Sequence, residues 1–449
     1  MTFRSLAISN IRGKWRAYSA FFMSCVFSVM IFYMYTAFIV HPDMLKGQMI
    51  EALEVRQGLI FCQYIVIIFS LLFVLYSNAA FLRTRKQEFG LFKMFGMTSM
   101  QLRKLIVFEN AIIAALAVGV GIGLGIMFSK LFFMMLEVLL EMNDPIPFTV
   151  PLRAIWQTAG SFFILFGLIT LWTAYQVGQT EIIHMLKAQM QSKQQLIQSR
   201  SLSILAAVCL GLAYGQALIV DAFNFALLAP IIMVTVIIGT YFLFTQLSIY
   251  ILQLAQGNSR FYYNRTNMII IAQLAHKLKD NARMLFIVSI LSAVILTASG
   301  AVYTLLRSVQ LDGAQTQYED PEGLFALILF IGMFISVLFF IAAGSMIYFK
   351  LFTELREDQE QYKALTRIGM TQDEIRKIIV TQLGIIFYVP CIVGIIHASF
   401  AMKAMDNVLQ LAHWSYSFGV ICIYVAMQTI YFLVTCHDYM NNVLRSNEI

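Results

Sequence analysis

Long apolar runs alternate with short polar connections along the whole chain. A helix needs about 20 residues to cross a hydrocarbon layer of about 30 Å, so each run predicts one membrane-spanning helix. There are ten such runs, near residues 17–40, 58–82, 106–135, 153–178, 202–220, 226–254, 284–306, 324–349, 379–402 and 414–436. The pattern therefore predicts an all-α polytopic membrane protein. The first run is too long for a signal-peptide core and no small-residue cleavage site follows it, so we expect it to be retained.

The connection after the second run is partly repeated after the eighth. Residues 83–107 align with residues 356–380 at a constant shift of 273, and Gly96-Met97-Thr98 falls on Gly369-Met370-Thr371. Such self-similarity at a fixed spacing marks an internal repeat.

Each copy predicts the same elbow. A charged amphipathic helix runs into a glycine, the residue that most readily adopts the left-handed conformation that ends a helix. A capping box then opens a second helix that enters the membrane. The predicted capping residues are Thr98, Gln101, Thr371 and Glu374. Ordinary solvated loops would explain the charge of these segments, but not the same elbow twice.

A second correspondence enlarges the repeat. Residues 7–18 resemble residues 270–281 at a shift of 263, and both segments suit a helix in the headgroup region with its cations toward anionic lipid. Spans 1 to 4 then correspond to spans 7 to 10 in the same orientation. We therefore predict a first module over 1–200, linking spans 5 and 6 over 201–255, and a second module over 256–449. Parallel repeats of this kind usually pack around a pseudo-two-fold axis normal to the membrane.

Composition and charge give the class and the topology. The chain is 60% hydrophobic and 12% charged, with a mean hydropathy of +0.76, unlike any soluble domain. With the N-terminus inside, 25 of the 31 Lys and Arg residues fall in inner segments, which places both termini and both elbows in the cytoplasm. A basic inner face is usual for membrane proteins and does not indicate nucleic-acid binding. The remaining cations, which include Lys46, Arg56 and Arg153, fall in the outer ends and loops.

Four alternate residues of the third span are glycine. In a water-exposed helix they would cost about 3–4 kcal/mol relative to alanine, so close helix packing must offset them. They form two GxxxG pairs, which allow another helix to approach to backbone distance. The residues are Gly119, Gly121, Gly123 and Gly125. A moving interface between helices is the functional alternative to simple packing.

Several kinds of chemistry have no motif here. The chain contains no GxxxxGK[ST] phosphate loop, no HExxH, no GxSxG and no Cys/His cluster at metal-ligand spacing. Its six cysteines lie in or at the ends of apolar runs, where a thiol behaves as a small hydrophobe. Few charges lie mid-membrane, which argues against an ion-driven carrier. We therefore expect no enzyme activity, no metal and no cofactor in this chain, and an external source of energy.

Three segments carry a resemblance to a known family: residues 76–105, 273–285 and 344–377. With these segments the chain resembles the FtsX-type ABC transporter permeases, and specifically the Bce-type branch that confers bacitracin and lantibiotic resistance in Gram-positive bacteria. The resemblance implies a permease subunit in the bacterial cytoplasmic membrane, served by two copies of an ATP-binding subunit that holds ATP and Mg. It also implies a sensor histidine kinase partner, and as ligands a peptide antibiotic and undecaprenyl pyrophosphate. If this lipid pyrophosphate binds, the outer cations Lys46, Arg56 and Arg153 are its candidate contacts.

The resemblance further implies which residues contact the ATP-binding subunits. In the first coupling elbow they are Glu88, Phe89, Leu91, Phe92, Phe95 and Gly96. In the second, which extends over 350–380, they are Tyr362, Leu365, Ile368 and Gly369.

One departure from the Bce-type pattern bears on function. Those permeases carry a large extracellular domain between spans 7 and 8, where this chain has only residues 307–323. Two alternatives to peptide resistance therefore stay open. One is a mechanical transducer that controls a cell-wall hydrolase, and the other is a sensing scaffold with little transport.

Overall fold

The computed structural model describes most of the chain, and all regular structure within the described residues is helical. The described residues are 15–41, 53–139, 148–179, 199–221, 223–263, 266–312, 321–409 and 414–445. Within them, eight helices are long and apolar enough to span a membrane, or nine if the bent pair Ser336–Phe352 and Glu357–Arg367 is one span. The all-α, multi-pass fold is confirmed.

The ten predicted runs all lie in helices, but two fall outside the count of eight. One is in α4, where the apolar stretch Val66–Leu82 is shorter than a full span, and the other is in α13, which contains the bent pair. In both cases the run is part of a helix of more than 40 residues.

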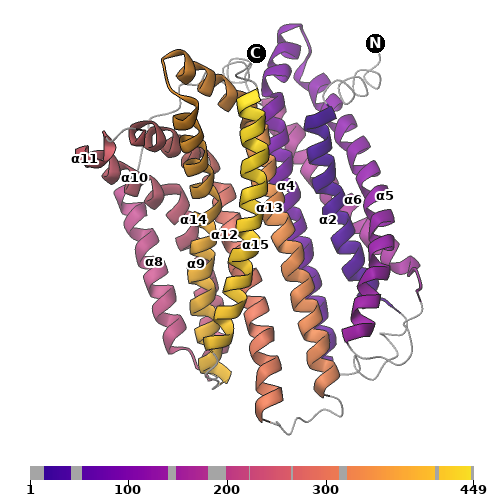
Figure 1. The fold of residues 1–449 in the computed structure, drawn as a ribbon. Helices are drawn as coiled ribbons and strands as arrows, with labels where there is room; N and C mark the ends of the chain where they lie inside the picture. The colour runs from indigo at the N-terminus through magenta and orange to yellow at the C-terminus, as the bar shows by residue number, and fades with distance from the viewer. Residues whose placement is uncertain are drawn as a thin grey trace. The chain divides into compact units, whose positions relative to one another are not determined.

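The chain divides into two compact units, residues 1–192 with 320–327, and residues 193–319 with 328–449. In the first unit α2 packs against three longer helices (Figure 1). The rings of Phe21 on α2 and Phe81 on α4 stack with their centroids 5.2 Å apart. The helices are α2 (Trp15–Ile39), α4 (Leu53–Met94), α5 (Ser99–Leu139) and α6 (Leu152–Gln179).

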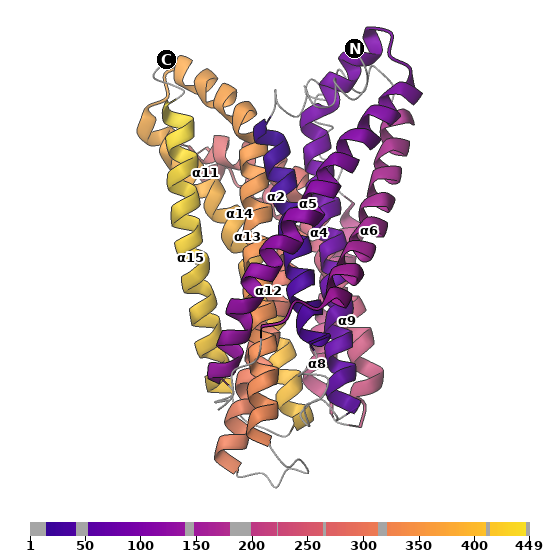
Figure 2. The same cartoon turned by 90° about the vertical axis from the view of Figure 1, so that its right-hand side faces the viewer.

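The second unit is built around the pair α12 and α14, with α15 against both (Figure 2). Its helices are α8 (Arg200–Ile219), α9 (Phe225–Phe242), the π-helical turn η2 (Leu243–Leu247), α10 (Ser248–Gly257), α11 (Ser259–Tyr262), α12 (Asn267–Asp312), α13 (Pro321–Arg367), α14 (Gln372–Leu409) and α15 (Trp414–Arg445).

Two glycines of α5 allow it to cross α2 closely. A Cβ added at Gly121 would lie 2.6 Å from the Val29 Cβ and 2.9 Å from the carbonyl oxygen of Val26. One turn later, a Cβ at Gly125 would lie 2.6 Å from the ring of Tyr33. These two glycines therefore pack against α2. At Gly119 and Gly123, the other predicted pair, an added Cβ would meet nothing within 4 Å.

The second unit repeats this crossing between α12 and α14. A Cβ added at Gly394 would lie 2.5 Å from the Ser292 Cβ and 3.0 Å from the carbonyl oxygen of Ser289. Gly394 follows Gly121 by 273 residues and Ser292 follows Val29 by 263, the two shifts found in the sequence. The repeat therefore extends to the way the helices pack.

A buried histidine joins α14 to the linking helices. The Nδ1 atom of His397 lies 2.8 Å from the hydroxyl of Tyr214 on α8, and its Nε2 atom lies 2.9 Å from the hydroxyl of Thr240 on α9. Both ring nitrogens thus have hydrogen-bond partners, and His397 links the three helices α8, α9 and α14.

Candidate coupling elbows

Both predicted elbows end a helix with the same backbone hydrogen bonds. Gly96 and Gly369 have φ of 89° and 98°, in the left-handed region that favours glycine. In the first elbow the amide of Gly96 donates to the Lys93 carbonyl at 3.1 Å, and the amide of Met97 donates to the Phe92 carbonyl at 3.0 Å. These two bonds define a Schellman motif.

The second elbow forms the same motif. The amide of Gly369 donates to the Thr366 carbonyl at 3.0 Å, and that of Met370 donates to the Leu365 carbonyl at 3.2 Å. The four atoms involved lie 273 residues after their counterparts, so the repeat holds at the level of single hydrogen bonds.

A capping box opens the helix after each elbow. The amide of Thr98 donates to the Gln101 side chain at 2.9 Å, and the amide of Gln101 donates to the Thr98 hydroxyl at 3.3 Å. Thr371 and Glu374 exchange the equivalent bonds at 3.0 and 3.3 Å. Each turn is therefore held on both sides by local hydrogen bonds that satisfy helix-terminal groups.

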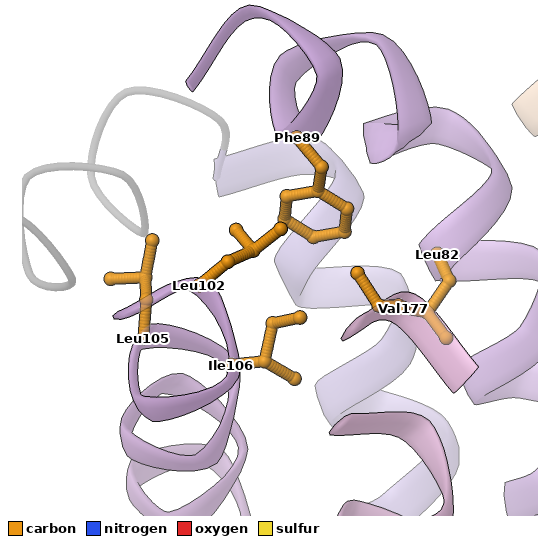
Figure 3. Close-up of a cluster of buried hydrophobic side chains, with 6 residues drawn as sticks. All are labelled: Leu82, Phe89, Leu102, Leu105, Ile106 and Val177. Carbon is orange, nitrogen blue, oxygen red and sulfur yellow. The ribbon is translucent and has the colours of Figure 1, made fainter. Parts of the chain in front are cut away.

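The inner side of the first elbow is a small hydrophobic core (Figure 3). Phe89, only 1% exposed, points into it from α4, and Val177 contributes from α6. Leu82, Leu102, Leu105 and Ile106 complete the cluster, and Phe92 and Met97 pack against it. Phe89 thus holds the elbow to its own unit and does not reach the surface.

A buried ion pair lies beside this cluster. The guanidinium of Arg85 on α4 donates two hydrogen bonds to the carboxylate of Glu109 on α5, one of them at 3.2 Å, and the two side chains are 2% and 1% exposed. Burial alone would lower the pKa of Arg85, but the hydrogen bond and charge of Glu109 raise it above its ordinary value. Arg85 therefore stays charged, and its ion pair with Glu109 ties the helix before the turn to the helix after it.

Aromatic rings surround the same guanidinium. The Arg85 Cζ atom lies 4.8 Å from the ring centroid of Phe89, 5.2 Å from that of Tyr18 and 5.5 Å from that of Phe81. Cation–π attraction strengthens in such desolvated sites. The elbow is thus joined to α2 as well as to α5.

The outer side of the first elbow is exposed and apolar. Phe95 is 85% exposed, and Leu91, Met94 and Met100 are exposed beside it. Burial and the guanidinium of Arg103 lower the pKa of Lys93, which borders this surface. Of the predicted contact residues, Leu91, Phe95 and Gly96 are exposed, Glu88 and Phe92 are half-buried, and Phe89 is buried.

The second elbow is held by different buried polar groups. The hydroxyl of Tyr362 on α13 donates to the side-chain oxygen of Gln382 on α14 at 3.3 Å, and the Gln382 amide donates to Gln273 on α12 at 2.5 Å. Asp358, one turn before Tyr362, accepts from Lys277 of α12 at 2.9 Å. It also accepts from the hydroxyl of Tyr439 on α15.

The second elbow differs from the sequence predictions in two places, at Tyr362 and at residues 270–281. Tyr362 is buried, whereas Ile368 and Gly369 are exposed and Leu365 is half-buried. Residues 270–281 are part of α12, which continues without a break into the span. Lys277 therefore points at Asp358 and not at lipid, because a buried carboxylate must have a partner.

A polar cleft of about 240 Å³ lies between α12 and α13 at this position. Its lining includes Gln273, His276, Asp280, Glu354 and Glu357. Among the described residues there is no group of His, Cys, Asp or Glu arranged to hold a metal ion.

Of the three predicted lipid-pyrophosphate contacts, the structure describes the side chain of one. Lys46 and the side chain of Arg56 lie outside the described residues. Arg153 is exposed in the first turn of α6.

Sequence reasoning missed three buried charges, Arg85, Glu109 and Asp358, and the half-buried Lys277 that pairs with Asp358. A signal was present, since the shift of 273 places Asp358 on Arg85 and Gln382 on Glu109. Each position is polar in both copies, although it lies on the side of the helix that carries the apolar contacts.

Two stretches of the chain match one family model. The model for the FtsX-like permease C-terminal region matches residues 60–182 and 333–436, and the two stretches begin 273 residues apart. Together they cover just over half of the chain, and they contain both elbows. The chain belongs to the FtsX-like permease family.

Its relatives define the class further. The chain is 27% identical to the uncharacterized ABC transporter permease YvcS of Bacillus subtilis, over 99% of this chain and 100% of the relative. It is also 27% identical to the ABC transporter permease protein YxdM of the same organism, over 90% and 94%. The bacitracin export permease protein BceB of Halalkalibacterium halodurans is 24% identical over 65% of this chain and 46% of the relative. The protein is an ABC transporter permease, with Bce-type permeases among its relatives.

The alignment with YvcS shows a difference in length. It spans 644 positions, whereas this chain has 449 residues, so at least 195 of its positions have no residue of this chain. The sequence places the missing segment at 307–323, and this stays a prediction.

Proposed function

We propose that this chain is the membrane subunit through which two copies of an ABC ATP-binding subunit drive the release or export of peptide antibiotics that act on cell-wall precursors. The observation that carries the proposal is the pair of capped elbows, each held rigidly on its inner side and exposed at its tip. In a permease family whose members work with ATP-binding subunits, exposed apolar side chains at such a tip indicate a protein interface.

The side of the membrane on which the elbows lie is proposed from the distribution of charge. The excess of Lys and Arg in the elbow-bearing connections supports a cytoplasmic position for both elbows and both termini, on the side of the membrane where ATP is available. We therefore restrict the proposed contact surface to the exposed members of the predicted set: Leu91, Phe95 and Gly96 in the first elbow, and Ile368 and Gly369 in the second.

The peptide substrate and the signalling partner are proposed only from the similarity of this chain to its relatives. Two relatives carry the name bacitracin export permease, and this supports a cell-wall-targeting peptide as the substrate class. A sensor histidine kinase partner, and recognition of undecaprenyl pyrophosphate, are proposed on the same basis.

The test begins with purification of the tagged chain from its native membranes and reconstitution in lipid nanodiscs. We expect native mass spectrometry to find two copies of one ATP-binding subunit per permease, and ATP hydrolysis to respond to bacitracin or a lantibiotic. We also expect deletion of the gene to lower the inhibitory concentration of one of these peptides. Absence of an ATP-binding subunit, or unchanged sensitivity to every such peptide, would refute the proposal.

One observation favours a second candidate, the control of a cell-wall hydrolase. The helices α12 and α13 have 46 and 47 residues. At 1.5 Å per residue the path along each helix is about 70 Å, well beyond the hydrocarbon layer, although α13 bends by 51° between Ser336–Phe352 and Glu357–Arg367. Each is therefore long enough to carry motion across the membrane. Division defects without a change in peptide sensitivity on deletion would favour this candidate.

A further inference from the structure

The two elbows share a backbone but differ at their surface. The shift of 273 pairs each exposed apolar residue of the first elbow with a residue of the second. The pairs are Leu91 with Ala364, Met94 with Arg367, Phe95 with Ile368, and Met100 with Asp373. Three of the four apolar side chains are therefore replaced by a methyl group or a charge, and only the residue before the glycine stays large and apolar.

The residues that differ between the two elbows are all exposed near the turn. Leu91 and Met94 lie on the last turn of α4, Phe95 directly follows the end of that helix, and Met100 lies on the first turn of α5 across the glycine. All four side chains are exposed, and they lie between residues 91 and 100 on the two sides of the turn. In the second elbow Ile368 is 76% exposed, but its neighbours at the matching positions are Ala364, Arg367 and Asp373, which are also exposed.

The two turns also differ in the charged residues around them. Residues 86–104 contain four Lys or Arg residues and one acid, Glu88, which lies 3.5 Å from buried Arg85. The matching residues 359–377 contain four Lys or Arg residues and three acids, Glu360, Asp373 and Glu374. The first elbow thus presents an apolar surface bordered by cations, whereas the border of the second is nearly balanced.

These differences have a consequence if the partner is a pair of identical subunits. Identical subunits present identical grooves, so any difference in affinity between the two sites must arise from the permease. An apolar groove with an acidic rim complements the first elbow better than the second, because large desolvated side chains and opposite charges both favour association.

We propose that the first elbow is the tight anchor for an ATP-binding subunit whose groove is apolar with an acidic rim, and that the second elbow is a weak, exchangeable contact for the second copy. This inference rests on the proposed function, which supplies the partner. It predicts a singly loaded complex at low subunit concentration, with the subunit on the first elbow.

The experiment uses the full chain in nanodiscs with the ATP-binding subunit that copurifies with it. Phe95→Asp and Ile368→Asp form a matched pair, because both positions precede the glycine and both side chains are exposed. Native mass spectrometry over a range of subunit concentrations measures the two loading steps. We expect Phe95→Asp to weaken the tight step by about 30-fold or more, as for an interface hot spot. Ile368→Asp should leave the tight step within about threefold of the parent and weaken only the second.

A gain-of-function variant keeps the inference testable if charges at either elbow disturb assembly. Ala364→Leu, Arg367→Met and Asp373→Met together give the second elbow the surface of the first, and we expect the second loading step to tighten by about 10-fold or more. Equal losses from Phe95→Asp and Ile368→Asp, or no gain from the triple variant, would overturn the asymmetry while leaving the proposed function intact. Full loading of the Phe95→Asp/Ile368→Asp double variant would instead overturn the assignment of both elbows.

A lipid contact is the competing use of an exposed apolar tip. A photo-reactive p-azidophenylalanine at position 95 should crosslink to the ATP-binding subunit in the assembled complex. Crosslinking of this residue to lipid alone would show that the tip inserts into the bilayer, and would overturn the inference.

Discussion

Replacement of Glu109 by glutamine tests the buried anchor of the first elbow most directly. The carboxylate is the buried counter-charge of Arg85, whose guanidinium also faces Phe81, Phe89 and Tyr18. The half-buried Glu88 is a second carboxylate partner, with its Oε2 atom 3.5 Å from the Arg85 Nε atom. Glutamine keeps the shape of the side chain and one oxygen acceptor but removes the charge. Loss of one partner of a buried ion pair costs about 3–5 kcal/mol, because the other charge stays buried without compensation. Since the amide still accepts one hydrogen bond and Glu88 keeps its ion pair with Arg85, we expect a loss at the lower end of this range, about 3 kcal/mol.

The measurement is the free energy of unfolding of the purified chain in bicelles, obtained by steric trapping with the trapping sites in the first unit. Lys104→Met is the matched control, since Lys104 is an exposed cation on the same helix and its loss should change stability by no more than about 0.5 kcal/mol. The double variant Arg85→Met/Glu109→Leu removes both charges. It should recover most of the loss, because apolar residues of similar volume often replace a buried pair at little cost.

Two results would refute the reasoning. A loss below about 1 kcal/mol for Glu109→Gln would mean that water or another group compensates Arg85. A double variant as unstable as the single one would mean that packing volume, and not charge pairing, holds the elbow.

The remaining predictions concern packing and the turn. Gly121→Ala should destabilise the chain by about 1–3 kcal/mol because its Cβ would collide with α2, whereas Gly123→Ala, whose Cβ meets open space, should be neutral or slightly stabilising; melting temperatures of the two compare them directly. Phe89→Ala should cost about 3–5 kcal/mol by leaving a cavity, while Phe95→Ala should cost no more than about 0.5 kcal/mol, and equal losses in chemical unfolding would contradict the burial of Phe89. Gly96→Ala should cost about 1–2 kcal/mol from its left-handed φ although its Cβ has room, and a wild-type melting temperature would show that the turn relaxes.

The elbows could be predicted from sequence because their determinants are local. A left-handed helix end requires glycine, and a capping box requires a hydroxyl with an amide or carboxylate three residues later. Gly96 and Gly369 with Thr98 and Thr371 meet these requirements within a few residues. The spans could be predicted for a similar reason, since length and apolar composition are read directly from the chain.

The direction of the elbow side chains could not be predicted in the same way. Phe89, Phe92 and Phe95 are spaced three apart, so successive rings turn progressively around the helix. Phe89 is buried, Phe92 is half-buried and Phe95 is exposed, and which ring faces the core depends on the position of α5 and α6. The charges of the two ion pairs were missed because their partners are distant in sequence. Arg85 and Glu109 are 24 residues apart, and Lys277 and Asp358 are 81 apart.

The two units carry opposite buried charges at the same position of the repeat. Position 85 is an arginine and its repeat position 358 is an aspartate, and both are buried. In the first unit the counter-charge comes from α5, so the ionic link crosses the glycine turn and joins the two helices of the elbow. In the second unit the counter-charge is Lys277 of α12, and the described contact between the buried polar groups of α13 and α14 is the neutral 3.3 Å hydrogen bond from Tyr362 to Gln382. A force on the first elbow should therefore pass to α5 with little bending of the turn. A force on the second should pass partly to α12, the helix before it, which suits a contact that is made and released.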